Sequence, residues 1–219
     1  MTAAVARPAD GDRDRDPVPA GQPAGAGRRG LIWLLAVAGA LGLAASSVLT
    51  FDKLRLLANP DYVPSCNINP IISCGSVMRT EQAALLGFPN SLLGLVGFTV
   101  VLATALGLAA GARYHRWYWL GLQAGSLLGV VLVHWLIGQS LYTIGALCPY
   151  CMVVWASTIA LFWYTTLHNL RTGVIPVGDR LRPVVRELNR YHWAVPVLWY
   201  AVIALLVLNR FWYYWQTLL

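Results

Sequence analysis

The chain has 219 residues, of which 58% are hydrophobic and only 11% are charged, against about 25% charged residues in an ordinary soluble domain. This composition excludes a soluble globular domain, because such a domain needs a far more polar surface. The net charge of +7 does not indicate a nucleic-acid partner, since no basic stripe is interleaved with aromatic residues on a folded surface.

The first 30 residues differ in composition from everything that follows. Residues 1–30 are rich in Pro, Gly, Ala, Asp and Arg and hold too little apolar surface to fold alone, so we expect a disordered cytoplasmic tail. Arg28 and Arg29 before an apolar run also fit a signal peptide, with a cleavage region at residues 43–46. The run is longer than the about 7–15 residues of a signal-peptide core, which favours a membrane span.

Five apolar runs are long enough to cross a bilayer, which takes about 20 apolar residues in a helix. They cover residues 31–51, 88–110, 117–137, 147–167 and 193–214. The runs predict an all-α polytopic membrane protein. Its parts are a four-helix transmembrane bundle at 31–170, a basic cytoplasmic loop at 171–192 and a fifth transmembrane helix at 193–219.

The basic residues indicate the orientation of the chain. Twelve of the 16 Lys and Arg residues precede the first run, separate the second from the third, or separate the fourth from the fifth. These segments share one side if every run crosses, and cytoplasmic loops carry such an excess. We therefore expect a multi-pass protein of the inner (plasma) membrane, with a cytoplasmic amino terminus and its carboxyl terminus on the outer, periplasmic side.

A long outer loop, residues 52–87, separates the first two runs. It begins with turn signals at Asn59-Pro60, Val63-Pro64 and Asn69-Pro70. From Ser73 onward the sequence is compatible with a helix, and Ser73 is a candidate N-cap. We expect a loop followed by a short helix near the membrane surface. A loop of this length is usually functional or disordered.

Two features of the third run are interpreted as packing features. Gly121, Gly125 and Gly129 recur at every fourth residue, and small residues at this spacing let helices approach closely in lipid. His134 is an ionisable residue within a span and hence a functional candidate. We favour a neutral His134 that bonds across a helix interface.

The four cysteines form two pairs on the same side of the membrane. Cys66 and Cys74 lie in the outer loop, and Cys148 and Cys151 form a Cys-Pro-Tyr-Cys motif at the start of the fourth run. With the orientation above, both pairs face the outer side, where disulfides form and persist. The sequence thus predicts a redox relay between a loop pair and a pair at the membrane edge.

The Cys148/Cys151 pair has a physical reason to be reactive. Free backbone N–H groups and the positive end of the helix dipole at a helix N-terminus both favour a thiolate. Pro149 suits the first helical turn, because its missing N–H costs nothing there.

Two other readings of the cysteines remain open. Two structural disulfides in a membrane scaffold protein are one, although the Cys148–Cys151 ring would constrain little chain. A zinc site is the other, but an oxidising compartment and the lack of a nearby histidine count against it, and we expect no metal. Asp61 and Glu81 lie near the loop thiols in sequence, and no role is assigned to either.

Three motifs resemble those of bacterial members of the vitamin K epoxide reductase family. They are the outer cysteine pair followed by Gly-Ser-Val-Met at 75–78, the Pro-Asn-Ser-Leu-Leu-Gly segment at 89–94 and the Ile-Gly-Ala-Leu-Cys-Pro-Tyr-Cys segment at 144–151. The resemblance covers residues 31–170. It implies a four-helix bundle around a quinone, which would be menaquinone or ubiquinone.

The resemblance also implies a role for each site residue. Cys66 would exchange with a thioredoxin-fold, DsbA-type partner, Cys74 would pass the electrons to Cys148, and Cys151 would face the quinone. The expected quinone contacts are Asn90, which would hydrogen-bond a carbonyl, Ser91 and Trp155. Trp155 stands where the vertebrate enzymes carry Tyr. Many bacterial members continue past the fifth helix into a fused thioredoxin-like domain. This sequence ends at Leu219, so we expect its partner to be a separate protein.

Three functions compete at this point. The first is a thiol oxidoreductase that supports disulfide formation in exported proteins by passing electrons to a membrane quinone. The second is the reduction of vitamin K epoxide or quinone as the physiological reaction. The third is a non-enzymatic membrane scaffold held by disulfides.

Overall fold

A computed structural model describes residues 24–216, and their regular secondary structure is helical. The expected tail at 1–30 therefore lies largely outside the described residues. The five long helices are α1 (Ala24–Ala58), α3 (Ser91–Ala109), α4 (Arg116–Gly138), α5 (Pro149–Arg171) and α7 (Ala194–Arg210). The short ones are α2 (Cys74–Met78), η1 (Glu81–Ala84), the π-helix η2 (Gln139–Ile144), η3 (Asp179–Leu181), α6 (Arg182–Arg190) and α8 (Trp212–Trp215).

Four of these helical segments are long and apolar enough to cross a membrane: Gly27–Ala58, Ser91–Ala109, Arg116–Ile144 and Pro149–Arg171. A fifth span results if Asp179–Arg190 and Ala194–Arg210, which meet at a 69° bend, count as one. The prediction of an all-α polytopic membrane protein is confirmed. The bend falls where the polar, arginine-rich α6 gives way to the apolar α7.

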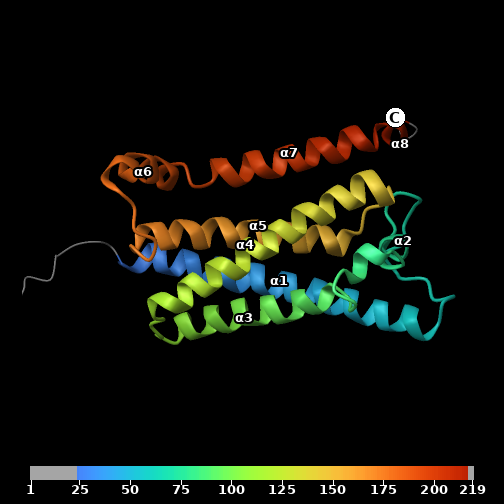
Figure 1. Cartoon of the computed structure of the whole chain (residues 1–219), viewed down its shortest axis with the longest axis horizontal. Coiled ribbons are helices and arrows are strands. Elements are labelled where there is room, and N and C mark those ends of the chain that lie inside the picture. Colours follow the sequence, from blue (N-terminus) through green and yellow to red (C-terminus); the bar gives the residue numbers. More distant parts are fainter. Residues whose placement is uncertain (1–23, 217–219) are drawn as a thin grey trace, which may run out of the picture.

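The bundle is built on α1, which packs against α3 and α5, while α4 packs against the other side of α5 (Figure 1). Glycine brings α1 and α3 together. A Cβ atom on Gly42 would lie 2.3 Å from the ring of Phe98, and one on Gly94 would lie 2.3 Å from Ser46 Oγ. A larger residue at Gly42 or Gly94 would force Phe98 or Ser46 to move, so the glycines allow α1 and α3 to pack as observed.

The expected close packing along the glycines of α4 is wrong for two of the three positions. A Cβ atom on Gly121 or Gly125 would meet nothing within 4 Å, and only Gly129 is close to a neighbour, Thr158, at 3.1 Å. The physical reason is that the face of α4 that carries Gly121 and Gly125 is exposed and meets no other helix of the described chain.

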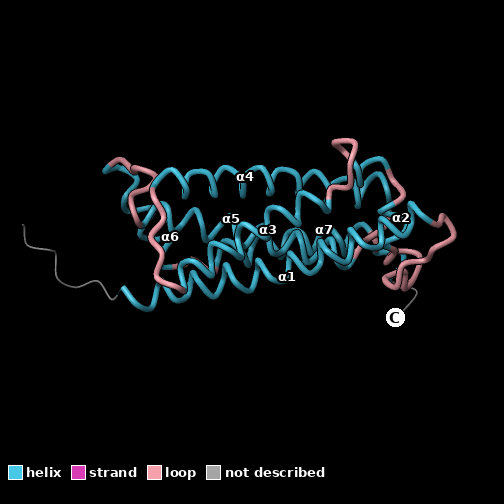
Figure 2. Tube along the Cα trace, turned by 90° about the horizontal axis from the view of Figure 1, so that it is seen from below, coloured by secondary structure: helices cyan, strands magenta, loops and turns pink. Residues whose placement is uncertain are grey.

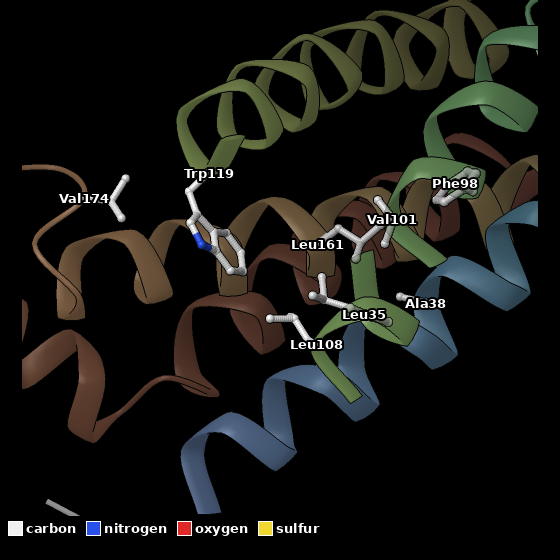
Figure 3. Close-up of a cluster of buried hydrophobic side chains, with 9 residues drawn as sticks. Leu35, Ala38, Phe98, Val101, Leu108, Trp119, Leu161 and Val174 are labelled. Carbon is white, nitrogen blue, oxygen red and sulfur yellow. The ribbon is translucent and has the colours of Figure 1, made fainter. Parts of the chain in front are cut away.

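The main apolar cluster lies toward the end of the bundle away from the cysteines. Figure 3 shows Leu35 and Ala38 of α1, Phe98 and Val101 of α3 and Leu161 of α5 converging there. Trp119 of α4 closes this cluster and is only 6% exposed. This cluster therefore fixes four helices relative to one another without any contribution from the cysteines.

Helix α7 is attached to the bundle by side-chain hydrogen bonds. Trp199 Nε1 donates to His134 Nε2 at 2.8 Å, while His134 Nδ1 lies 2.8 Å from the carbonyl oxygen of Val130. The imidazole therefore carries its proton on Nδ1 and bonds across a helix interface, as expected from the sequence. Tyr200 and Arg210 donate to the backbone carbonyls of Ala156 and Leu141.

The two ends of the bundle carry different segments. Figures 1 and 2 show α2 and the carboxyl-terminal α8 at one end, and α6 and the start of α1 at the other. The cysteine loop and the carboxyl terminus therefore share an end, and the basic α6 lies at the opposite one.

Candidate redox site

A single parallel β-bridge joins the outer loop to the start of α5. Ile72 pairs with Leu147: Ser73 N donates to Leu147 O at 2.9 Å, and Leu147 N donates to Ile71 O at 2.7 Å. Cys74 comes two residues after Ile72, and Cys148 comes directly after Leu147. The bridge therefore brings one cysteine of each pair together.

Two asparagine side chains shape the loop between Cys66 and Cys74. Asn69 Oδ1 accepts from the backbone N–H groups of Ile71 and Ile72, at 3.0 and 2.7 Å. This is an Asx turn, in which the side chain replaces a backbone acceptor. Asn67 Oδ1 accepts from Gly75 N at 2.8 Å and from Ser73 Oγ at 3.3 Å.

The short helix expected after Ser73 is present as α2. Ser73 Oγ accepts from Ser76 N at 3.2 Å, and Ser73 has extended backbone angles. This is the geometry of an N-cap, so that prediction is confirmed. A Cβ atom on Gly75 would lie 2.9 Å from the amide of Asn67, so a larger residue there would displace that side chain.

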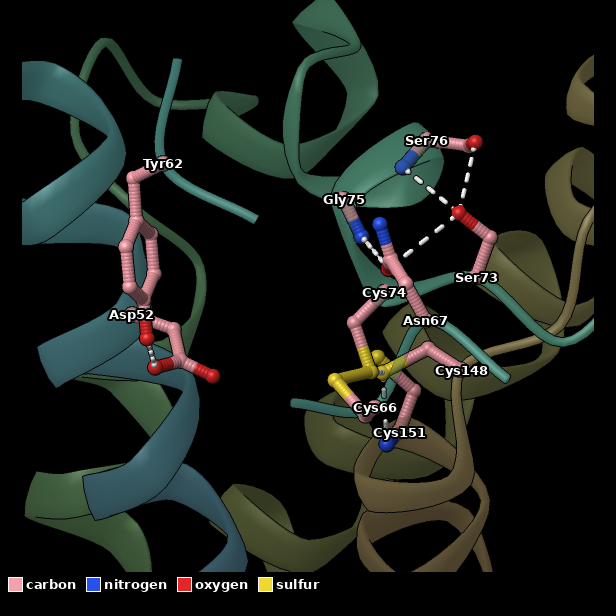
Figure 4. Close-up of a disulfide and its surroundings, with 10 residues drawn as sticks. All are labelled: Asp52, Tyr62, Cys66, Asn67, Ser73, Cys74, Gly75, Ser76, Cys148 and Cys151. Carbon is pink, nitrogen blue, oxygen red and sulfur yellow. Dashed lines mark hydrogen bonds between the residues drawn. A yellow bond between two sulfur atoms is a disulfide. The ribbon is translucent and has the colours of Figure 1, made fainter. Parts of the chain in front are cut away.

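The four sulfur atoms meet at the bridge (Figure 4). Cys66 and Cys74 form a disulfide, Cys148 and Cys151 are free thiols, and Cys148 Sγ lies 3.3 Å from Cys74 Sγ. Cys66, Cys74 and Cys148 are 6%, 0% and 1% exposed. Cys66 is held in place in this disulfide state, because the turn around Asn69 is fixed by hydrogen bonds and Cys66 is buried.

Cys148 is the N-cap of α5. Pro149 lies in the first turn, as expected from the sequence. Its sulfur accepts from Cys151 N at 3.4 Å. The hydrogen bond from the Cys151 thiol, aided by the backbone N–H groups of Cys151 and Tyr150, lowers the pKa of Cys148 against the opposing effects of burial and the Asp52 charge. A cysteine attacks a disulfide, and leaves one, as the thiolate, so the lowered pKa of Cys148 favours exchange with Cys74 in both directions.

The surroundings of the sulfurs are mostly apolar. Leu49 and Leu56 of α1, Val77 and Met78 of α2 and Ala146 pack around Cys66, Cys74 and Cys148. Cys151 packs against this cluster and also against a second one that contains Ile71, Leu141, Trp155 and Phe211. Among residues 24–216, no group of three or more His, Cys, Asp or Glu side chains is placed to hold a metal ion.

The three residues expected to contact a quinone each have their own partners within the bundle. Asn90 Oδ1 accepts from Leu85 N at 3.1 Å and Asn90 Nδ2 donates to Gln82 O at 2.7 Å, so this side chain ties η1 to α3. Ser91 shares a hydrogen bond of 2.8 Å with Thr50 of α1. Trp155, one turn after Cys151, is 5% exposed within the second cluster.

These residues still fit a quinone chemically. An amide NH₂ group has two hydrogens, and Asn90 uses one of them on Gln82. The other remains for a carbonyl acceptor. A planar ring that reached Cys151 would meet the apolar side chains of the two clusters that flank it.

Asp52, Tyr62 and Asn67 belong to the site and were missed from the sequence. Asp52 is 5% exposed and accepts from Tyr62 OH at 2.9 Å. The only sequence signal for it is an acidic residue directly after the first apolar run. Asp61 and Glu81, the acidic residues noted from the sequence, are exposed.

A membrane bundle that holds a buried disulfide against a second cysteine pair defines a membrane disulfide oxidoreductase. The chain belongs to the vitamin K epoxide reductase family, whose sequence profile matches residues 33–166. That range includes all four cysteines. No curated protein sequence matches the chain. Membership implies an oxidoreductase of a family that works with quinone-type cofactors, at a lipid bilayer and with redox partners.

Proposed function

We propose that this protein oxidises the thiols of a separate thioredoxin-fold, DsbA-type partner and passes the electrons to a membrane quinone. The reaction would support disulfide formation in exported proteins. The observation that carries the proposal is the 3.3 Å separation between Cys148 Sγ and Cys74 Sγ. Thiol–disulfide exchange needs this approach of one sulfur to another.

The exchange between the two pairs takes two steps. The Cys74 thiolate attacks Cys148 of a Cys148–Cys151 disulfide, so a Cys74–Cys148 bond forms and Cys151 leaves with the electron pair. The Cys66 thiolate then attacks Cys74, and Cys148 leaves as the thiolate. The pairing in the structure, with Cys66–Cys74 oxidised and Cys148 and Cys151 reduced, is the product of this exchange.

Cys66 is the residue proposed to react with the partner protein, and Cys151 the one proposed to face the quinone. A bound quinone supplies an acceptor for two electrons and two protons. Asn90 is suited to hold a carbonyl oxygen through its second amide hydrogen, and Ser91 offers a hydroxyl on the same turn. Trp155 supports α5 one turn below Cys151 from within the second cluster.

Redox potentials favour a quinone over a soluble acceptor. A DsbA-type disulfide lies near about −120 mV, and cytosolic glutathione lies about 100 mV or more below it. At about 1.4 kcal/mol per 30 mV, oxidation by the glutathione pool would be uphill by roughly 5 kcal/mol. A membrane quinone avoids this cost and lies in the same bilayer as the thiols.

The orientation proposed for the chain places all four cysteines and the carboxyl terminus outside an inner membrane. It is supported by the basic α6 at the opposite end of the bundle. An impermeant maleimide, added to reduced intact cells, should label a variant that retains only Cys66. The absence of labelling, with labelling restored in lysed cells, would contradict this orientation.

The function is tested by anaerobic stopped-flow kinetics of the purified protein with a reduced DsbA-type partner and either menaquinone or ubiquinone. We expect quinol to form at the rate at which partner thiols disappear. Reduction of vitamin K epoxide without oxidation of the partner would indicate the other reaction of the family. No redox change with any acceptor would leave a structural role for the disulfide.

A further inference from the structure

Asp52 is a buried carboxylate that the relay described above does not use. It lies on α1 between Leu49 and Leu56, and both of these side chains pack around Cys66, Cys74 and Cys148. Residues three and four apart on a helix share a face. Asp52 therefore faces the sulfur cluster, and Figure 4 shows its carboxylate on the side toward the cysteines.

Only one oxygen of this carboxylate is bonded. Oδ1 accepts from Tyr62 OH at 2.9 Å, whereas Oδ2 is buried and has no hydrogen-bond partner among residues 24–216. The nearby cations do not neutralise it: Lys53 donates to Met78 O, and Arg79 donates to the carbonyls of Pro60 and Tyr62. Burying a charged oxygen without a partner is costly, so an unused acceptor here requires an explanation.

The charge of Asp52 affects the pKa of a nearby thiol. It acts to raise the pKa of Cys148, against the hydrogen bonds that lower it. The other titratable groups that face this space are Tyr62 and Cys66 from the loop, Cys74 from α2, and Tyr150 and Cys151 from α5. Among them Asp52 is the only carboxylate, and a carboxylate is a ready proton acceptor beside a thiol.

We infer that Asp52 is the proton acceptor of the relay: it takes the proton of the Cys66 thiol as that sulfur attacks Cys74, and returns it to Cys148. The inference rests on the proposed thiol relay. The Cys66–Cys74 bond forms, the Cys74–Cys148 bond breaks, and its electron pair stays on Cys148 Sγ. One proton moves from Cys66 through Asp52 Oδ2 to Cys148, and the carboxylate is regenerated. Tyr62 is a positioning residue that holds Oδ1 and thereby directs Oδ2.

The reverse of this step can be followed without a quinone or a partner protein. In full-length protein with Cys151→Ala, in lipid nanodiscs, the Cys66–Cys74 disulfide converts to Cys74–Cys148 and releases the Cys66 thiol. Acid quenching, denaturation and mass-tag alkylation of Cys66 give the rate. We expect Asp52→Asn in this background to slow the conversion about 10²-fold or more at pH 7. The rate of that variant should then rise about tenfold per pH unit, more steeply than the parent.

Two further variants separate proton transfer from a structural role. Asp52→Ala should be slow, and added formate, but not chloride at equal ionic strength, should restore its rate. Asp61→Asn, which removes an exposed loop carboxylate, should match the parent. A parental rate in Asp52→Asn would overturn the inference. A slower rate with the parental pH slope and no rescue by formate would also overturn it, because Asp52 would then only hold Tyr62. Failure of the wild-type protein to reduce any quinone would refute the proposed function. The exchange rates could still be measured, because the exchange assay contains no quinone.

Discussion

The two ends of the bundle hold their buried polar groups in different ways. At the end near α6, defined here as the amide end, Asn169 donates to Gln123 Oε1 at 3.0 Å, and Gln123 donates to Thr166 at 2.9 Å. Arg116 donates to Val174 O at 3.0 Å. At the cysteine end, residues 59–80 and 139–151, the central contact is the 3.3 Å approach of Cys148 to Cys74.

The amide end therefore contributes to the stability of the bundle, and the cysteine end carries the proposed reaction. The hydrogen bonds of the amide end join α4 to α5 and have no reason to change during a reaction. The contact at the cysteine end joins two sulfurs that exchange bonds when they react. Substitutions at the amide end should therefore lower the stability of the bundle, and substitutions at the cysteine end should lower the rate of electron transfer.

The largest effect is expected from Cys151→Ala. Without Cys151 the Cys148–Cys151 disulfide that takes electrons from Cys74 cannot form, so quinone reduction should fall by about 10³-fold or more. The Cys74–Cys148 disulfide should accumulate and be detectable by proteolysis and mass spectrometry under non-reducing conditions. With a small dithiol as the reductant, the matched variant Cys66→Ala should keep most of its quinone reduction. Equal loss in both variants would remove the proposed order of the relay.

The pH dependence of exchange should report the lowered pKa of Cys148. A thiol whose pKa lies below its ordinary value of about 8.5 is largely thiolate at lower pH than usual. Exchange should stay fast below pH about 8.5 and fall about tenfold per unit only beneath the lowered pKa. The same ionisation stabilises the fold above the ordinary thiol pKa, and this contribution is lost as the pH falls through the lowered pKa.

Quench-flow measurement of exchange across the pH range checks this. Because the Cys151 thiol is the main cause of the shift, Cys151→Ala should move the midpoint for Cys148 attack upward. An unchanged midpoint in that variant would show that the helix N-terminus alone sets the reactivity.

A smaller effect is expected from Asn67→Ala. This change removes the acceptor for Gly75 N and Ser73 Oγ, and each such hydrogen bond contributes about 0.5–1.5 kcal/mol. The exchange rate should fall about tenfold because Cys74 is less firmly held against Cys148. Asn67→Asp keeps an acceptor oxygen and should be close to the wild type. If both variants exchange at the wild-type rate, the bridge alone suffices to position Cys74.

The smallest effect tests the amide end. Asn169→Ala removes a fully buried amide and its bonds to Gln123 and Trp119 O, and should lower the free energy of unfolding by about 1 kcal/mol. Thermal unfolding in detergent measures it, with Asn209→Ala, an exposed position on α7, as the control. The rate of disulfide exchange should not change. A large loss of exchange in Asn169→Ala would show that the two ends are coupled.

Much of the fold follows from local sequence patterns. Helix length and hydropathy identify the spans, and Ser73 as a candidate N-cap predicts α2. The Cys-Pro-Tyr-Cys motif predicts the start of α5, with Pro149 in its first turn. Each of these depends on residues within a few positions of one another. The close helix contact was assigned to the glycines of α4 rather than to Gly42 and Gly94, because spacing alone does not say which face meets a neighbour.

The site itself depends on contacts between distant residues. The bridge of Ile72 to Leu147 has no signal in either segment, since a single pair of residues makes no strand pattern. The burial of Cys66 and Asp52 also depends on the way α1 faces the loop and α5. The cysteines were found because their chemistry is recognisable in sequence, whereas Asp52 becomes notable only once its burial and its unused oxygen are known.

The bridge between Ile72 and Leu147 has a consequence for biosynthesis. Cys74 leaves the ribosome 74 residues before Cys148, so the loop pair is complete while its acceptor is still to be made. Until α3 and α4 have been inserted and Leu147 has met Ile72, a Cys66–Cys74 disulfide has no internal thiol to react with. A newly made chain therefore acquires its redox activity only after the fourth span is in place. Chains truncated before Leu147 should form the loop disulfide and transfer no electrons from it.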